Sequence, residues 1–295
     1  MQRFIDPDVL AGISGLDLIA KTVVDGFVAG LHRSPNFGFS QEFAEYRAYT
    51  PGDDLRRIDW NVFARTERAY LKLYRGETNT LLTVLLDASN SMNYSSHRVS
   101  KMDYARFTAA ALFYLTIHTQ RDAAGLIVFD EELRNYIRPS NRQGQLHRLL
   151  SGLEHAEARA RTDFSKPLDH FQKFLRRRGV AIIISDFYDS PARIIRTLEP
   201  LRFRGNEVVL FHVLDPKEVR PGLRGPTTLI DLETQESLEV SPEYSQGEYG
   251  KKIDAHIEAL GDGARSAGMD YHLLVTDRPL DDALREYLAI RQGRL

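Results

Sequence analysis

Short apolar runs alternate with longer segments of helical periodicity along most of this chain. The apolar runs are rich in leucine or β-branched residues, as in strands buried on both faces, and lie at residues 81–86, 180–184, 208–213 and 271–275. The helical segments span residues 101–119, 142–155, 164–178, 191–203, 249–267 and 279–290. This alternation predicts an α/β fold with a doubly wound, mostly parallel sheet and helices on both faces.

Two places depart from the alternation and predict hairpins. Residues 124–129 and 132–137 are joined by Asp130-Glu131, which would add one antiparallel edge strand to the sheet. Residues 223–240 hold a second hairpin pattern, inside an insertion at about residues 216–248. This insertion could recognise clients or be decoration, and the sequence does not separate the two.

The first 79 residues have a pattern of their own. Apolar side chains recur there at spacings of three and four, as on a helix that packs on a larger body: Leu10, Ile13, Leu16, Ala20, Val23, Phe27 and Leu31. A partner-binding or membrane-surface helix would carry the same stripe, but core packing is the favoured interpretation. Residues 32–79 have turn signals without sustained periodicity, which predicts a small β-rich layer. We therefore expect an N-terminal segment at residues 1–79 and a main domain at residues 80–295.

Composition removes several classes of function. The 295 residues carry a formal charge of -2, so no overall field attracts nucleic acid or an anionic membrane. The chain has no cysteine, which excludes disulfides, thiolate metal sites and cysteine nucleophiles. Asp17, Lys21 and Asp25 interrupt the most apolar N-terminal stretch, so it predicts neither a signal peptide nor a membrane span. We expect a cytoplasmic protein without direct membrane insertion.

Oxygen-bearing side chains follow the predicted strands where ligands gather in doubly wound sheets. Asp87, Ser89 and Ser91 leave the strand at 81–86 with a carboxylate and two hydroxyls at positions i, i+2 and i+4. Asp186 follows the strand at 180–184, and Thr162 precedes a predicted helix. Each residue alone could be an ordinary turn or helix-cap residue. Together they predict a site of hard oxygen ligands for one divalent cation, Mg²⁺ first and Mn²⁺ or Ca²⁺ next.

This set resembles the metal-ion-dependent adhesion site of the von Willebrand factor A superfamily, whose pattern is Asp-x-Ser-x-Ser, then Thr, then Asp. The resemblance narrows to the domain-of-unknown-function family 58 through residues 43–66, FAEYRAYTPGDDLRRIDWNVFART, and residues 277–288, DRPLDDALREYL. It implies a von Willebrand factor A-like fold. It also implies that Asp87, Ser89, Ser91, Thr162 and Asp186 are the metal ligands and that Asp163 lies just outside the coordination sphere.

The resemblance further implies a working partnership. Members of this family look like partners of MoxR-type AAA+ ATPases and are thought to act in chaperone-like maturation of client protein complexes or in metal insertion. Some relatives carry N-terminal membrane helices, which this sequence lacks. This departure favours a soluble member over a membrane-associated role.

Physical reasoning favours binding over catalysis at such a site. Two carboxylates and three hydroxyls leave a divalent cation with an open position, which an acidic residue of a client could fill. The sequence has no H-E-x-x-H, P-loop, Gly-x-Ser-x-Gly or Gly-x-Gly-x-x-Gly motif. A non-enzymatic interaction module is therefore expected. A metal-dependent hydrolase, such as a nuclease or phosphatase, and a scaffold with a vestigial site are the alternatives.

The N-terminal signature offers a second candidate surface. Arg56, Arg57, Asp59 and Trp60 could dock a partner, or the arginines and acids could staple this layer to the main domain. The staple is favoured, and a buried position is expected for Trp60, the single tryptophan.

Overall fold

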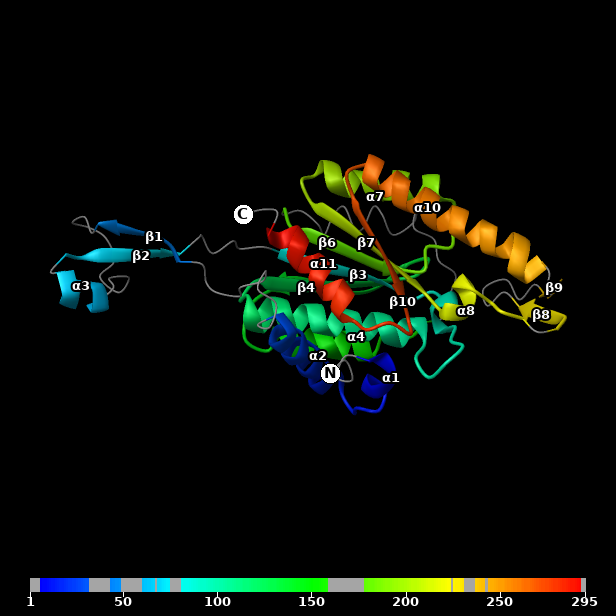
Figure 1. The fold of residues 1–295 in the computed structure, drawn as a ribbon, viewed down its shortest axis with the longest axis horizontal. Coiled ribbons are helices and arrows are strands. Elements are labelled where there is room, and N and C mark those ends of the chain that lie inside the picture. Colours follow the sequence, from blue (N-terminus) through cyan, green and yellow to red (C-terminus); the bar gives the residue numbers. More distant parts are fainter. Residues whose placement is uncertain are drawn as a thin grey trace. The chain divides into compact units, whose positions relative to one another are not determined.

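A computed structural model gives the fold of the chain (Figure 1). It describes residues 6–31, 43–48, 60–66, 68–74, 81–158, 178–223, 225–230, 237–241 and 244–292. Backbone contacts divide the chain into two compact units, one formed by Met1–Phe27 with Thr80–Leu295 and the other by Val28–Asn79. The N-terminal helical residues up to Phe27 thus group with the larger unit.

A six-stranded sheet forms the centre of the larger unit. Its strands are β3 (Leu81–Asp87), β4 (Ala123–Phe129), β5 (Leu133–Ser140), β6 (Val180–Ser185), β7 (Glu207–Leu214) and β10 (Asp270–Val275). They lie in the order β10-β7-β6-β3-β4-β5, and β5 runs antiparallel to β4 while all other neighbours are parallel. The expected doubly wound sheet with one antiparallel edge strand is confirmed.

Helices cover both faces of this sheet (Figure 1). One face carries α4 (Lys101–Tyr114), α5 (Gln145–Glu154) and α11 (Asp281–Gln292), and the other carries α7 (Pro191–Phe203) and α10 (Gly250–Ser266). Two of these helices are extended by five-residue π-helices, α4 by η3 (Leu115–Thr119) at its end and α10 by η4 (Ser245–Tyr249) at its start. The helix predicted at 164–178 lies outside the described residues apart from its last position.

The sheet is apolar because its central strands are buried on both sides. All six residues of β6, VAIIIS, are buried. On the α7 and α10 face, Ile183 of β6 packs with Ile194 and Leu198 of α7 and Leu260 of α10 in one core cluster. This burial explains why the central strands read as unbroken apolar runs rather than as alternating patterns.

The N-terminal stripe forms two helices rather than one. Helix α1 (Pro7–Leu10) and helix α2 (Leu16–Leu31) are separated by a turn in which Gly15 has a φ of 89°. A left-handed conformation is easy for glycine and interrupts a right-handed helix, which accounts for the break. Most of the predicted stripe is nevertheless buried, namely Leu10, Leu16, Ala20, Val23 and Phe27. The favoured interpretation as core packing is confirmed for these positions.

Smaller β elements complete the description. In the Val28–Asn79 unit, β1 (Phe43–Ala48) pairs antiparallel with β2 (Tyr70–Tyr74), and a helix, α3 (Trp60–Thr66), lies between them in sequence. In the larger unit, β8 (Thr227–Ile230) pairs antiparallel with β9 (Ser237–Val240), as the second hairpin pattern predicted. Among the described residues, no helix combines the length and apolarity needed to cross a membrane.

Candidate metal site

The two strands that carry the predicted carboxylates are neighbours at the centre of the sheet. From β3 the chain crosses to β4 on one side, and the later strands β6 and β7 lie on the other. The carboxyl ends of β3 and β6 therefore flank the point at which the strand order reverses. Ligands of doubly wound sheets bind at such a point. Asp87 ends β3 and Asp186 follows β6, so both acids leave the sheet there.

The loop after β3 folds back on its own first residue. Oδ1 of the buried Asp87 accepts a hydrogen bond from the Ser89 backbone N–H at 2.8 Å, and the hydroxyls of Ser89 and Ser91 lie 3.0 Å apart. Oδ2 of Asp87 accepts from the hydroxyl of Ser185 at 2.5 Å. The structure thus brings Asp87, Ser89 and Ser91 together and adds Ser185, which sequence reasoning missed.

The loop after β6 contains a residue in an unusual backbone conformation. Phe187 has a φ of 49° and is fully buried, and its backbone N–H donates to the Ser185 hydroxyl at 2.9 Å. A bulky residue in the left-handed region costs on the order of 1 kcal/mol or more and is retained where the surroundings enforce it. Here the strain lies one residue after Asp186. It directs the chain away from β6 at the candidate site.

Two buried carboxylates, Asp87 and Asp186, share this site. Burial, together with the nearby charge of Asp186, raises the pKa of Asp87 to about 7. Asp186 is 1% exposed, and its Oδ1 has no hydrogen-bond partner among the described residues. A buried acceptor without a donor is costly, and a divalent cation would satisfy it. The donor set of carboxylates and hydroxyls therefore fits a hard cation.

The candidate site contains few of the histidine, cysteine, aspartate and glutamate side chains that hold metal ions in many proteins. The described residues contain no group of three or more histidine, cysteine, aspartate or glutamate side chains able to hold a metal ion. The predicted site needs only two carboxylates, because its other ligands are hydroxyls. Whether a cation binds here stays a prediction.

A buried lysine contacts the site and was not foreseen. Nζ of Lys101 donates to Oδ2 of Asp186 at 2.7 Å and to Oε1 of Glu218 at 2.6 Å. Burial alone would lower the pKa of Lys101, but the charges of Asp186 and Glu218 outweigh burial and raise it, so the side chain is an ammonium. The sequence offered one signal, since Asp215-Pro-Lys-Glu218 after an apolar run is a capping-box pattern that fixes Glu218 at the end of β7.

Two other acids at strand ends serve the loops rather than the site. Asp130, after β4, accepts from the Glu132 backbone N–H at 2.9 Å and from Nε of Arg134 at 2.7 Å. Asp215, after β7, accepts from the backbone N–H and hydroxyl of Ser96 at 2.8 and 2.6 Å, and from the Lys217 backbone N–H at 2.7 Å. Their oxygens are thus used within the protein.

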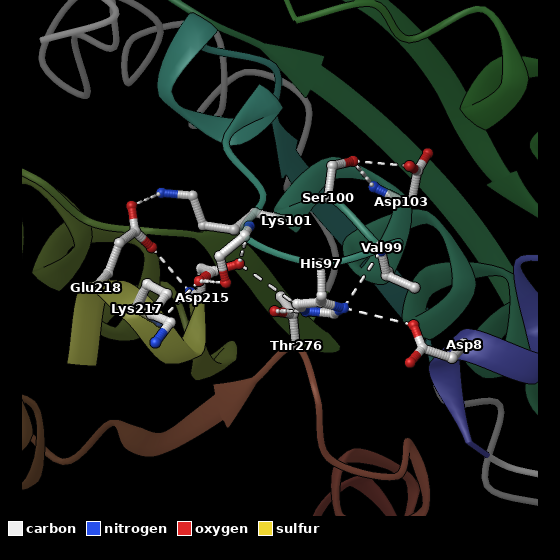
Figure 2. Close-up of polar contacts among 11 residues, drawn as sticks. Asp8, His97, Val99, Ser100, Lys101, Asp103, Asp215, Lys217, Glu218 and Thr276 are labelled. Atoms are coloured by element: carbon white, nitrogen blue, oxygen red, sulfur yellow. Dashed lines mark hydrogen bonds and ion pairs between the residues drawn. The ribbon is translucent and has the colours of Figure 1, made fainter. Parts of the chain in front are cut away.

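His97 ties the loop after β3 to its surroundings (Figure 2). One ring nitrogen, Nε2, lies 2.8 Å from Oγ1 of Thr276 at the end of β10, and the other, Nδ1, lies 3.5 Å from Oδ1 of Asp8 in α1. Nε2 also lies 3.9 Å from Oδ2 of Asp215. Three distant segments therefore converge on the loop that carries Ser89 and Ser91.

The remaining predicted site residues fall mostly outside the described residues. These are Thr162 and Asp163 of the metal set, and Arg56, Arg57 and Asp59 of the N-terminal signature. Trp60 is described and is 60% exposed, with its ring edge-to-face to Phe63 at 5.9 Å between centroids. The expected buried position of Trp60 is therefore wrong. A unit of about fifty residues has too little core to enclose every aromatic side chain.

Comparisons with known proteins give the family of this chain and the solved structures that it resembles. The family model described as "Protein of unknown function DUF58" matches residues 45–288. An uncharacterized protein of Mycobacterium tuberculosis H37Rv is 30% identical over 294 residues, covering 98% of this chain and 92% of that protein. Among solved structures, the conserved hypothetical protein BatB of Bacteroides thetaiotaomicron has a TM-score of 0.49 at 12% identity, covering 72% of this chain and 99% of that one. A von Willebrand factor type A protein of Catenulispora acidiphila has a TM-score of 0.36 at 15% identity, covering 62% and 43%.

Proposed function

We propose that this chain, which belongs to the family described as Protein of unknown function DUF58, is a divalent-cation-dependent protein-interaction module. The observation that carries this proposal is the pair of buried carboxylates, Asp87 and Asp186, at the point where the strand order reverses. One of them has a raised pKa, and the other has an oxygen without a hydrogen-bond donor among the described residues. Both features are expected where the Lys101 ammonium, which binds the other oxygen of Asp186, neutralises the two carboxylates only in part.

The cation would be held by side-chain oxygens from the loops after β3 and β6. Asp87, Ser89, Ser91 and Asp186 would supply oxygens, with Thr162 as a further hydroxyl from its own loop. When bound, Mg²⁺ or Mn²⁺ would supply a positive charge with an open position, to which an acidic side chain of a client could bind. Ser185 would keep Asp87 oriented, since its hydroxyl donates to Oδ2 of that carboxylate.

The other strand-end acids support binding rather than hydrolysis. A hydrolase needs a second metal or a placed general base beside the first metal. Asp130 and Asp215 would be the candidates for a second metal, but Asp130 is paired with the guanidinium of Arg134, and Asp215 accepts from both the backbone N–H and the hydroxyl of Ser96 and from the Lys217 backbone N–H. We therefore propose a non-enzymatic module.

An ATPase partner is the finer part of the proposal. The chain has no P-loop, so any ATP-driven step must come from another protein. By resemblance that protein is a MoxR-type AAA+ ATPase, and this chain would act as its adaptor or chaperone-like partner on client complexes. Purified chain and purified ATPase should form a complex by size-exclusion chromatography, and two separate peaks at micromolar concentration would count against this partnership.

Thermal and denaturant unfolding test the cation site directly. For the full chain, the unfolding free energy should rise on replacing EDTA with millimolar Mg²⁺ or Mn²⁺, by about 2.7 kcal/mol when the cation is at a hundred times its Kd. Asp87→Ala should fold but lose this dependence. The exposed Asp262→Ala, on α10, is the matched control and should keep it.

Pull-downs then test whether the cation matters for binding. Client proteins should be recovered with wild type in Mg²⁺ and lost with chelator or with Asp87→Ala. Recovery of the same proteins under all three conditions would refute a cation-dependent interaction.

A further inference from the structure

Lys101 stands where a cation is doubly unfavourable. Its side chain is 0% exposed, and it is the first residue of the 14-residue helix α4, after the N-cap Ser100. A helix N-terminus carries partial positive charge and favours anions, and a buried ammonium loses its hydration. Such a placement persists only where nearby negative charge compensates for both costs.

The compensation comes from two carboxylates held from different strands. Asp186 follows β6, and its Oδ2 lies 2.7 Å from Nζ of Lys101. Glu218 lies in α8 (Pro216–Val219), after β7, and its Oε1 lies 2.6 Å from the same Nζ (Figure 2). The rings of Tyr188 and Tyr94 lie 4.9 and 5.9 Å from Nζ and add cation–π attraction. The ammonium is thus surrounded rather than free to leave.

Glu218 is itself fixed in position. Its other oxygen, Oε2, accepts from the Asp215 backbone N–H at 2.8 Å, which completes a capping box with the Asp215 side chain. Asp215 is anchored by Ser96 and by the Lys217 backbone N–H. The carboxylate that shares Lys101 therefore belongs to a rigid end of β7.

The two oxygens of the Asp186 carboxylate differ in their contacts. Oδ2 binds the ammonium, and Oδ1 has no partner among the described residues. A divalent cation held by Asp87, Ser89, Ser91 and Oδ1 of Asp186 would thus share one carboxylate with a fixed ammonium. Like charges on opposite oxygens of a buried carboxylate repel strongly, because little water screens them.

We propose that Lys101 sets the affinity of the candidate cation site, weakening it by charge, and that Glu218 offsets part of this effect. This inference rests on the proposed function. A lone cation would bind weakly, and a client's carboxylate would supply the negative charge that the lysine removes. Cation and client would then bind together more readily than either alone.

Calorimetric titration of Mg²⁺ and of Mn²⁺ into the full chain tests the proposal. Lys101→Met keeps the length of the side chain without its charge and should bind at least about tenfold more tightly than wild type. Glu218→Gln removes the second carboxylate that compensates the charge of Lys101. This variant should therefore bind the cation at least about threefold more weakly than wild type. The double variant restores the net charge of the site and should lie between the two single variants.

Opposite signs separate charge from simple packing. If Lys101 only held the loops together, both single variants would weaken binding in parallel with lost stability, and such a result would overturn the proposal. So would a double variant as tight as Lys101→Met, because Glu218 would then have no effect. If Lys101→Met does not fold, the double variant compared with Glu218→Gln isolates the lysine, and about tenfold tighter binding is again expected.

The test also distinguishes this inference from the proposed function. Cation binding that Asp87→Ala abolishes, with no opposite shifts in the two charge variants, would leave the function standing and remove the role of Lys101. No binding by any variant, Lys101→Met included, would refute the cation site and this inference together. Binding by Lys101→Met but not by wild type would support both.

Discussion

Buried polar atoms at the residue scale differ in whether a donor reaches them. Asp87 accepts from Ser89 and Ser185, whereas one oxygen of Asp186 has no donor among the described residues. An unsatisfied buried acceptor costs about 1–3 kcal/mol. At Asp186 this cost falls beside Asp87 and the two serines, where a cation could offset it.

His212 predicts a specific dependence of stability on pH. It lies on β7, fully buried, with Nδ1 2.7 Å from the hydroxyl of Tyr271, and burial lowers its pKa to about 3. The unfolded chain binds a proton at this histidine below about pH 6.5, whereas the folded chain does not until about pH 3. Stability should therefore fall with decreasing pH across this window, by up to about 1.4 kcal/mol per pH unit from this residue.

Replacing the histidine should remove this contribution. In urea unfolding between pH 6.5 and 4, His212→Gln should show a shallower slope of unfolding free energy against pH than wild type. Tyr271→Phe removes the hydrogen-bond partner but not the titrating group, so its slope should match wild type. Equal slopes for wild type and His212→Gln would contradict a neutral buried histidine.

At the scale of elements, the pattern predicted the sheet well because its central strands are buried on both faces. Such strands read as continuous apolar runs, and the residues that leave them were correctly placed at the carboxyl end of the sheet. Helix α7 matches its predicted span of residues 191–203, between a proline at its first turn and Gly205 with a φ of 85° just beyond it. The proline and the glycine at its two ends therefore gave the correct boundaries for this helix.

Other elements depended on conditions that periodicity does not register. The break between α1 and α2 follows from the backbone conformation of Gly15, which leaves the apolar spacing intact. The ion pair of Asp186 with Lys101 joins residues 85 apart in sequence, so no local motif predicts it. Contacts of this kind arise from the topology of the sheet, and only the structure reveals them.

The start of β6 gives a prediction for a single element. Gly179 comes directly before β6 and lies against the first residue of β3. A Cβ added at Gly179 would lie 2.8 Å from Cβ of Leu81 and would also crowd the Leu81 carbonyl. Gly179→Ala should therefore lower the unfolding free energy by about 1–3 kcal/mol, because backbone must shift to admit one methyl group. Gly225→Ala has open space around it and should change stability by less than about 0.5 kcal/mol in the same urea titration. An effect of Gly179→Ala on stability as small as that of Gly225→Ala would show that β6 and β3 can move apart at little cost in free energy.

At the scale of the whole molecule, the candidate site is assembled from three loops of the larger unit. Asp87 to Lys101, Ser185 to Phe187 and Asp215 to Glu218 meet because β3, β6 and β7 are neighbours and parallel. A sequence motif describes one loop at a time, which is why Asp87 and Asp186 were recognised but the contacts of Lys101 with Asp186 and Glu218 were not. The side chains that fix charge at this site come from the arrangement of the sheet.

The N-terminal helix shows how far this larger unit extends. Phe27 of α2 is 2% exposed, and the guanidinium of Arg285, on α11, lies 5.8 Å from its ring centroid. Because Phe27 is part of the core, Phe27→Ala should lower the unfolding free energy by about 3–5 kcal/mol in denaturant titrations of the full chain. Leu18→Ala, on the same helix but 50% exposed, should cost less than about 1 kcal/mol. Similar small effects at both positions would instead favour a helix that is free for a partner or a membrane surface, because its apolar side would then not contribute to folding.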